Sequence, residues 1–249
     1  MQGLKERAIF GIPPNTRLHW NYFLALERDL ESVSRYIEFC ADNLNTYSIE
    51  LAHLLLSAAS EVDALAKCIC TLLDPNAKAE NINHYRGIIK ASEDSETYPF
   101  FIKGNQPVVA DKHKHRLSEL RVYVPRYNLE CIPWESWATD KNPDWWHSYN
   151  KVKHERSRHF NKATLKNALE ALSALLAMNY VHCRLEIAKP EVRYQYWGKN
   201  VTRRLQPGST FLRFWGQAFY DNPIAELGDH IGSVSQDVMR LSGDLSERD

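Results

Sequence analysis

The sequence predicts a mainly α-helical protein: a helical bundle with a partly irregular, partly β insertion and an irregular C-terminal extension. Apolar residues recur at intervals of three and four through 18–44, which is the period of an amphipathic helix. The stretch 47–74 is longer and largely apolar, and 163–187 is apolar on more than one face. A helix that is apolar on several faces belongs at the centre of a bundle.

The chain divides into a lead-in at 1–17, a helical domain at 18–189 with an insertion at 94–142, and an extension at 190–249 that we expect to pack on the bundle. Prolines separate aromatic and β-branched residues in the insertion, where 120–134 is expected to form one or two short strands. The insertion is too small and too rich in proline to hold a core of its own.

Signals at the helix ends fix the remaining boundaries. The first helix should begin at Thr16 or Leu18 and reach Leu44. Polar residues then supply a stop and the N-cap of the second helix: Asn43, Asn45 and Thr46. Asp74-Pro75 ends the second helix, because proline cannot continue one, and a shorter helix follows at 77–93.

Composition excludes several classes of protein. The 249 residues carry 31 basic and 31 acidic side chains, so the chain has no broad positive electrostatic field. An anionic partner would therefore have to bind a local basic patch. The N-terminus lacks the apolar run of a signal peptide, and no stretch approaches the roughly 20 apolar residues of a membrane span. Five scattered cysteines do not suggest a disulfide framework. We expect a cytoplasmic protein that does not bind membranes.

The residues 145–166 form the most basic stretch of this neutral chain. Its six cationic side chains oppose a single acid, Glu155; they are Lys151, Lys153, Arg156, Arg158, Lys162 and Lys166. As one continuous helix, the stretch would place Asn150, His154 and Arg158 on one stripe, four residues apart. This stripe presents an imidazole among cations and is the best candidate site in the sequence.

Aromatic residues indicate which side of that helix is buried. Four tryptophans stand at its beginning, Trp134, Trp137, Trp145 and Trp146, and we interpret them as a packed aromatic corner instead of a base-stacking platform. Tyr149 and Val152 continue the apolar face at helical spacing. Asn142-Pro143-Asp144 begins the helix, with Pro143 in its first turn.

Four segments follow one another in an order that carries a resemblance: a long first helix, an alanine- and leucine-rich second helix ending in EVDALAK, an insertion, and YNKVKH before another apolar helix. Over roughly 18–92 and 142–187 the chain resembles the HEPN superfamily of bacterial defence and toxin proteins. The resemblance implies a helical bundle that is commonly a homodimer. Catalytic members are metal-independent ribonucleases that promote attack of a ribose 2′-hydroxyl on the adjacent phosphate.

The resemblance also implies roles for individual residues. Catalytic HEPN proteins carry an Arg, a polar residue and, a few residues later, a His. By this pattern Asn150 is the orienting polar residue and His154 the catalytic acid and base, a role that suits histidine because its unperturbed pKa is about 6.5. Tyr149 stands where the motif has Arg, so the cation would have to come from Arg156 or Arg158.

The sequence therefore predicts an RNA-binding protein and metal-independent endoribonuclease of bacterial anti-phage or toxin defence. The side chains expected to contact RNA are Lys151, Lys153, Arg156, Arg158 and Lys162. We expect no cofactor and no metal, because Asp111, His113 and His115 lie in a lysine-rich loop that suits a metal poorly. The alternative is a non-catalytic or nucleotide-sensing module that binds a partner protein of a defence or toxin–antitoxin system.

Overall fold

The described part of the chain is mainly helical, as the sequence predicts. A computed structural model describes residues 14–94, 102–103, 106–107, 116–188, 205 and 208–214, all within one compact unit, 1–215. None of the helices in these ranges is long and apolar enough to cross a membrane. Residues 1–13 of the predicted lead-in and most of the C-terminal extension fall outside the described residues, as do Asp111, His113 and His115, whereas residues 14–17 already belong to the first helix.

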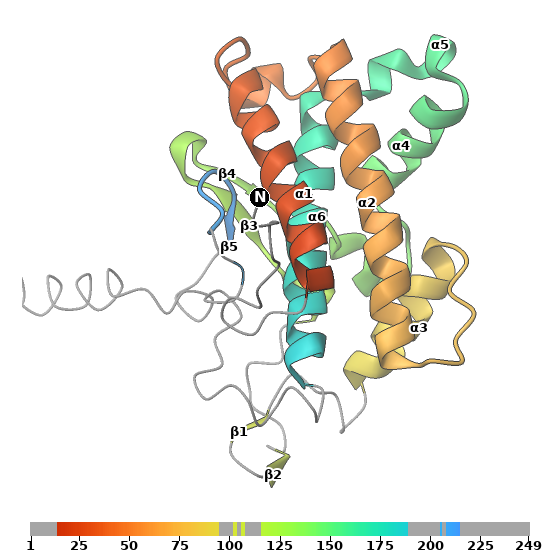
Figure 1. The fold of residues 1–249 in the computed structure, drawn as a ribbon. Coiled ribbons are helices and arrows are strands. Elements are labelled where there is room, and N and C mark those ends of the chain that lie inside the picture. The colour runs from red at the N-terminus through yellow and green to blue at the C-terminus, as the bar shows by residue number, and fades with distance from the viewer. Residues whose placement is uncertain are drawn as a thin grey trace, which may run out of the picture. The chain divides into compact units, whose positions relative to one another are not determined.

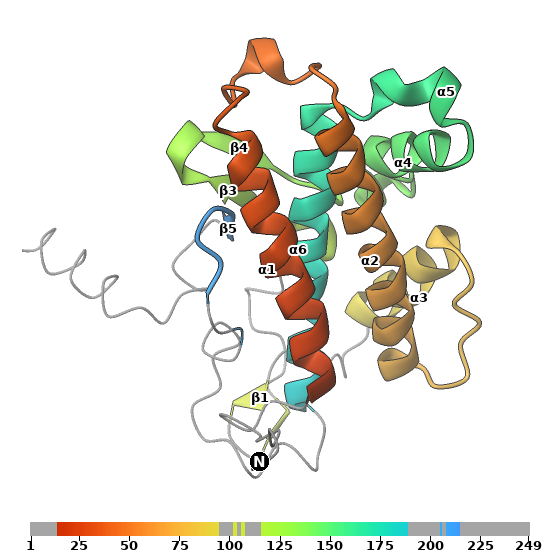
Figure 2. The same ribbon diagram turned by 45° about the horizontal axis from the view of Figure 1, so that its top comes forward.

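Three long helices build the core. They are α1 (Pro14–Val33), α2 (Ile49–Leu73) and α6 (Leu165–Ala188), and they lie side by side in both ribbon views (Figures 1 and 2). Every residue of α6 from 171 to 183 is buried. The prediction of a central helix with several apolar faces is confirmed, because α6 packs on α1, α2 and α4 (Asp144–His154).

The first helix is shorter than predicted, ending at Val33 instead of Leu44. Beyond it the chain turns, and the buried Phe39 packs its ring 5.0 Å from that of Tyr127 and 5.9 Å from that of Phe211. These contacts with distant parts of the chain outweigh the local helical pattern. The N-cap prediction is also wrong: Ser48 caps α2, its hydroxyl accepting from the Leu51 N–H at 3.2 Å.

Short elements fill the insertion. The 3-10 helices Leu117–Glu119, Pro125–Tyr127 and Glu135–Thr139 lie in it, while Ala41–Asn43 and Phe160–Lys162 lie outside. The third predicted helix, α3 (Ile82–Asp94), precedes the insertion and begins later than the predicted residue 77. Two short strands occupy the predicted range, β3 (Val122–Val124) and β4 (Leu129–Cys131), and they pair as an antiparallel hairpin that turns at Asn128 with φ 51°. Strand β5 (Arg213–Phe214) adds to β3, giving the antiparallel order β4-β3-β5. Strands β1 (Ile102–Lys103) and β2 (Gln106–Pro107) pair separately.

A buried carboxylate ties the segment before β5 to the bundle. Glu27 of α1 is only 3% exposed. Its carboxylate accepts from the backbone N–H of Phe211 at 3.0 Å, that of Leu212 at 2.8 Å and the hydroxyl of Ser209 at 2.5 Å. A buried carboxylate is tolerated only when its lone pairs are satisfied in this way. The described part of the C-terminal extension is therefore held against α1.

The predicted aromatic corner is confirmed. Trp134, Trp137 and Trp145 are each at most 1% exposed, and their rings meet at centroid distances of 4.4 Å and 5.3 Å. The Trp145 indole donates to the Pro133 carbonyl at 2.9 Å. From the other side, the Lys90 ammonium of α3 reaches the Trp137 carbonyl at 3.1 Å. The corner thus joins the insertion and α3 to the beginning of α4.

Candidate nucleic-acid interface

The basic stretch is not one helix. Helix α4 ends at His154, and Glu155 adopts φ −136° and ψ 56° before a second helix, α5 (Arg156–His159), begins. The predicted continuous helix through Asn150, His154 and Arg158 is therefore wrong. The apolar stripe explains the break, because the next positions on it after Val152 are Arg156 and His159, which give a longer helix nothing to bury.

One face of α4 is buried in the core, and we call it the dry face. Trp145, Tyr149 and Val152 are buried, at 0%, 4% and 0% exposure, so the predicted apolar stripe does face the core. Pro143 stands one place earlier than predicted, as the N-cap residue. Because the Tyr149 side chain is buried in the core, a side chain at residue 149 does not face solvent. An arginine could not act there without unpacking this face.

The four predicted catalytic residues do not lie on one helix. Asn150 is half-buried, and its amide donates to the Trp146 carbonyl at 3.0 Å within α4. His154 is exposed at the last position of that helix. Arg156 and Arg158 are exposed beyond the break, and Arg158 pairs with Glu155 at 3.3 Å. The break thus takes Arg158 out of the helix that carries Asn150 and His154, so the stripe expected from the sequence is not formed.

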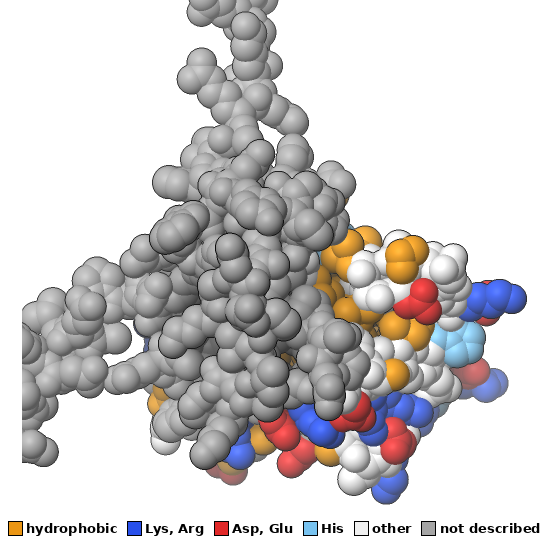
Figure 3. All heavy atoms as spheres, turned by 90° about the horizontal axis from the view of Figure 1, so that it is seen from below, with side chains coloured by type: hydrophobic (Ala, Val, Ile, Leu, Met, Phe, Trp, Pro, Cys, Tyr) orange, Lys and Arg blue, Asp and Glu red, His pale blue; other side chains and the backbone are white. Residues whose placement is uncertain are grey.

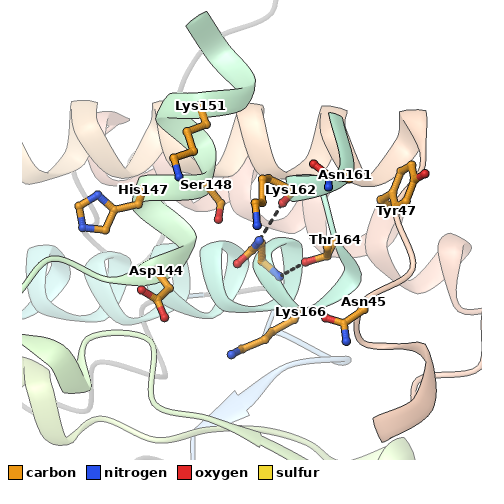
Figure 4. Close-up of a pocket in the computed structure, with 11 residues that line it drawn as sticks. Asn45, Tyr47, Asp144, His147, Ser148, Lys151, Asn161, Lys162, Thr164 and Lys166 are labelled. Carbon is orange, nitrogen blue, oxygen red and sulfur yellow. Dashed lines mark hydrogen bonds between the residues drawn. The ribbon is translucent and has the colours of Figure 1, made fainter. Parts of the chain in front are cut away.

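An open polar cavity of about 520 Å³ lies beside α4, on the side away from its dry face. Its lining comes from the loop before α2, from α4 and from the chain around the beginning of α6: Asn45, Tyr47, Asp144, His147, Ser148, Lys151, Asn161, Lys162, Thr164, Lys166 and Asn167. Figure 4 shows His147 and Asp144 at one end and Tyr47, Asn45 and Asn161 at the other. The three lysines lie between them.

Backbone hydrogen bonds fix the loop 44–47 to the beginning of α6. The Leu165 N–H donates to the Thr46 carbonyl at 2.9 Å and the Lys166 N–H to the Leu44 carbonyl at 3.0 Å. The Asn167 N–H is satisfied by the Thr164 hydroxyl at 3.2 Å. These are the amides that a helix N-terminus would offer to an anion, and all three are already used. Any anion in the cavity must therefore be held by side chains.

Positive charge dominates the lining. Lys151, Lys162 and Lys166 oppose Asp144, and Lys166 lies 3.9 Å from Glu170. Burial raises the pKa of Glu170, and Asp144 adds to the rise while Lys166 counteracts it. Within the described ranges, neither Lys151 nor Lys162 has an acidic partner within 4.0 Å, so both charges are available to a ligand. By contrast, acidic and basic side chains alternate on the described surface seen from below (Figure 3).

Of the predicted RNA-contacting residues, Lys151 and Lys162 line the cavity and three do not. Lys153 lies with its ammonium 5.3 Å from the centre of the Tyr149 ring. Arg156 and Arg158 belong to α5 and are outside the lining.

Sequence reasoning missed His147 and the loop residues Asn45 and Tyr47. His147 had a signal: it stands four residues before Lys151, on the same side of α4. Asn45 and Tyr47 had none, because only tertiary structure brings the loop before α2 to the beginning of α6.

Known proteins give no further guide to the site. No family model, curated protein or solved structure matches the chain. What the cavity does must therefore be argued from its own residues.

A second polar cluster joins the three core helices. The His19 ring nitrogen of α1 lies 2.5 Å from the Glu61 carboxylate of α2, and the His19 ring packs edge to face on the buried His182 of α6, with centroids 5.6 Å apart. Asp63 of the same helix points elsewhere and accepts from Tyr85 and Lys67. Among the described residues no group of three ligands suits a metal. We interpret this cluster as a contact between helices.

Proposed function

We propose that this protein binds RNA and that its basic cavity holds the phosphate backbone. The observation that supports this best is the convergence of Lys151, Lys162 and Lys166, from α4, from the turn after α5 and from α6, on one open polar cavity. Cations brought together on separate elements repel each other unless an anion neutralises them. A polyanion gains affinity at such a site by releasing its counterions.

Several properties of the cavity suit a nucleic acid better than a small metabolite. It is open, so it can admit part of a longer chain. Most of its polar groups are lysines and amides, which contact phosphate and sugar without reading sequence. Ordinary salt bridges could instead neutralise the lysines, but within the described ranges only Lys166 has an acid within 4.0 Å.

Cleavage of the bound RNA is the further part of the proposal. By resemblance to HEPN ribonucleases, His154 would take the proton of a ribose 2′-hydroxyl or give one to the leaving 5′-oxygen. Its position supports this role in one respect: it is exposed at the end of α4, two turns along the helix from His147 of the cavity. The missing cation would come from Arg156 or from the second copy of a homodimer. Bacterial defence or toxin activity belongs to the same proposal.

A second candidate function is RNA or nucleotide binding without cleavage. Tyr149 favours it, because the position where the motif has Arg is 4% exposed and packed against Trp146 with ring centroids 5.2 Å apart. The chain would then act as a sensor or scaffold with a partner protein. This candidate keeps the cavity and gives His154 no role.

Binding is tested by fluorescence anisotropy with a labelled, unstructured RNA of about a dozen nucleotides. We expect the double variant Lys151→Gln/Lys162→Gln to bind about tenfold more weakly, because two phosphate contacts are lost. The matched control is Lys78→Gln/Lys141→Gln, which removes two exposed lysines outside the cavity and should bind like the wild type. Equal affinities of the two double variants would overturn the proposal.

Cleavage is tested on the same RNA with a chelator present. The expected products end in a 2′,3′-cyclic phosphate, and His154→Ala should slow their formation by at least about 100-fold. His53→Ala is the control, because His53 is an exposed histidine of α2 that does not line the cavity. A wild-type protein that binds the RNA and leaves it intact would support the second candidate.

A further inference from the structure

Tyr47 is an exposed aromatic residue inside a basic cavity. It is 51% exposed, whereas Tyr85 and Tyr149 are buried. The ring meets that of Phe160 edge to face, with centroids 5.7 Å apart and planes at 87°. A backbone bridge to Thr164 holds its main chain. Tyr47 is thus a positioned ring with half its surface open.

The surroundings of Tyr47 are suited to a nucleobase. Figure 4 shows Tyr47 at one end of the cavity with Asn161 and Asn45, and the lysines next to them toward the middle. In the described ranges, the side-chain amides of Asn45 and Asn161 make no hydrogen bond, so donors and acceptors stand ready at the edge of a stacked base. The aromatic face and the amides match a base, and the lysines beside them match its phosphate.

We propose that the cavity binds one unpaired nucleotide of an RNA strand, with its base stacked on Tyr47 and its phosphate between Lys151 and Lys162. This inference rests on the proposed RNA binding and names the form of RNA. A base within a duplex has both faces covered by its neighbours and cannot reach the ring. The protein therefore selects single strands, loops or ends over continuous duplex.

The experiment compares four probes in anisotropy or competition: a short single-stranded RNA, the same RNA in a duplex, a strand of equal length in which every base is absent, and a free nucleoside monophosphate. The variants are Tyr47→Ala, Tyr47→Phe and, as matched control, Tyr36→Ala, which removes an 84% exposed ring outside the cavity. Thermal unfolding of each variant checks that it is folded.

We expect Tyr47→Ala to bind the single strand about tenfold more weakly, while Tyr47→Phe and Tyr36→Ala bind like the wild type. The abasic strand should bind the wild type and Tyr47→Ala equally, because it cannot stack. Competition by the free monophosphate at concentrations similar to those of the oligonucleotide would overturn the strand-binding site and identify a nucleotide pocket instead.

Two further results would overturn the inference. One is unchanged affinity of Tyr47→Ala for the single strand; the other is an equal loss of affinity for the abasic strand, which would mean that the ring only supports the fold. If either result occurs and Lys151→Gln/Lys162→Gln still weakens binding, the proposed RNA binding stands and only the stacking on Tyr47 is wrong. If neither change alters affinity, both fail.

Discussion

The two faces of α4 differ in almost every physical property. One face buries Trp145, Tyr149 and Val152, and the Trp145 indole donates a hydrogen bond to the Pro133 carbonyl. The opposite face presents His147 and Lys151 to an open polar cavity. The dry face fixes where the helix lies, whereas the cavity face adds little packing and is free to bind. On this account, changes to the first should alter stability, and changes to the second should alter affinity.

The largest effect should follow from truncating the dry face. Trp145→Ala removes a fully buried ring and its hydrogen bond, and large-to-small changes of this kind cost about 3–5 kcal/mol. Denaturant unfolding measures this loss. Tyr36→Ala, at an exposed ring, should change the free energy of unfolding by less than about 0.5 kcal/mol. A loss below about 1 kcal/mol for Trp145→Ala would show that the corner does not hold α4.

Glu93 is a buried acid whose protonation should make the free energy of unfolding depend on pH. Glu93 of α3 is 6% exposed, and its carboxylate accepts from the Leu117 N–H at 2.8 Å. Burial raises its pKa from 4.5 to about 7, against the lowering effects of that hydrogen bond and of Arg116. The folded state therefore holds this proton more tightly than the unfolded state, and protonation of Glu93 favours folding. This contribution to the free energy of unfolding is complete below pH 4.5 and is lost as the pH rises to about 7.

Glu93→Gln should remove that dependence. Compared with the wild type, the variant should gain stability between pH 4.5 and pH 7, by about 3 kcal/mol at most. The measurement is the free energy of unfolding of both proteins across this range. Glu135→Gln, at an exposed acid, serves as control and should run parallel to the wild type. Parallel curves for Glu93→Gln as well would contradict the assignment.

A smaller loss is expected where Glu27 holds the C-terminal segment. Glu27→Gln keeps the shape but replaces a charged acceptor of three backbone N–H groups and the Ser209 hydroxyl, at a cost of about 1–3 kcal/mol. Thermal unfolding would reveal it. Glu31→Gln, one turn further along α1 and exposed, should have almost no effect. RNA affinity should stay unchanged in both variants, because neither residue lines the cavity.

The sequence predicts the dry face better than the cavity, and the reason is physical. Burial leaves a periodic pattern, so the spacing of Trp145, Tyr149 and Val152 is enough to place them on the core side of the helix. The break at Glu155 could not be placed, because no Gly or Pro marks it and the cause is a lack of apolar partners for Arg156 and His159. For that reason the predicted stripe of Asn150, His154 and Arg158 is not formed.

The cavity depends on contacts between distant segments. The Thr46 and Leu44 carbonyls accept the first N–H groups of α6, and this brings Tyr47 to the same cavity as Lys162 although more than a hundred residues separate them. Such pairing leaves no local signal. Charge was the exception, because clustered lysines in a neutral chain marked the stretch, and two of the predicted contact residues, Lys151 and Lys162, do line the cavity.

The central claim, that the cavity face binds phosphate and does not hold the fold, is tested most directly by the salt dependence of RNA affinity. Three lysine contacts to a single strand predict a slope of about −2 for the logarithm of affinity against the logarithm of salt concentration, and Lys151→Gln/Lys162→Gln should reduce it to about −1. The free energy of unfolding should change by less than about 0.5 kcal/mol. An unchanged slope, or a large loss of stability, would contradict the account.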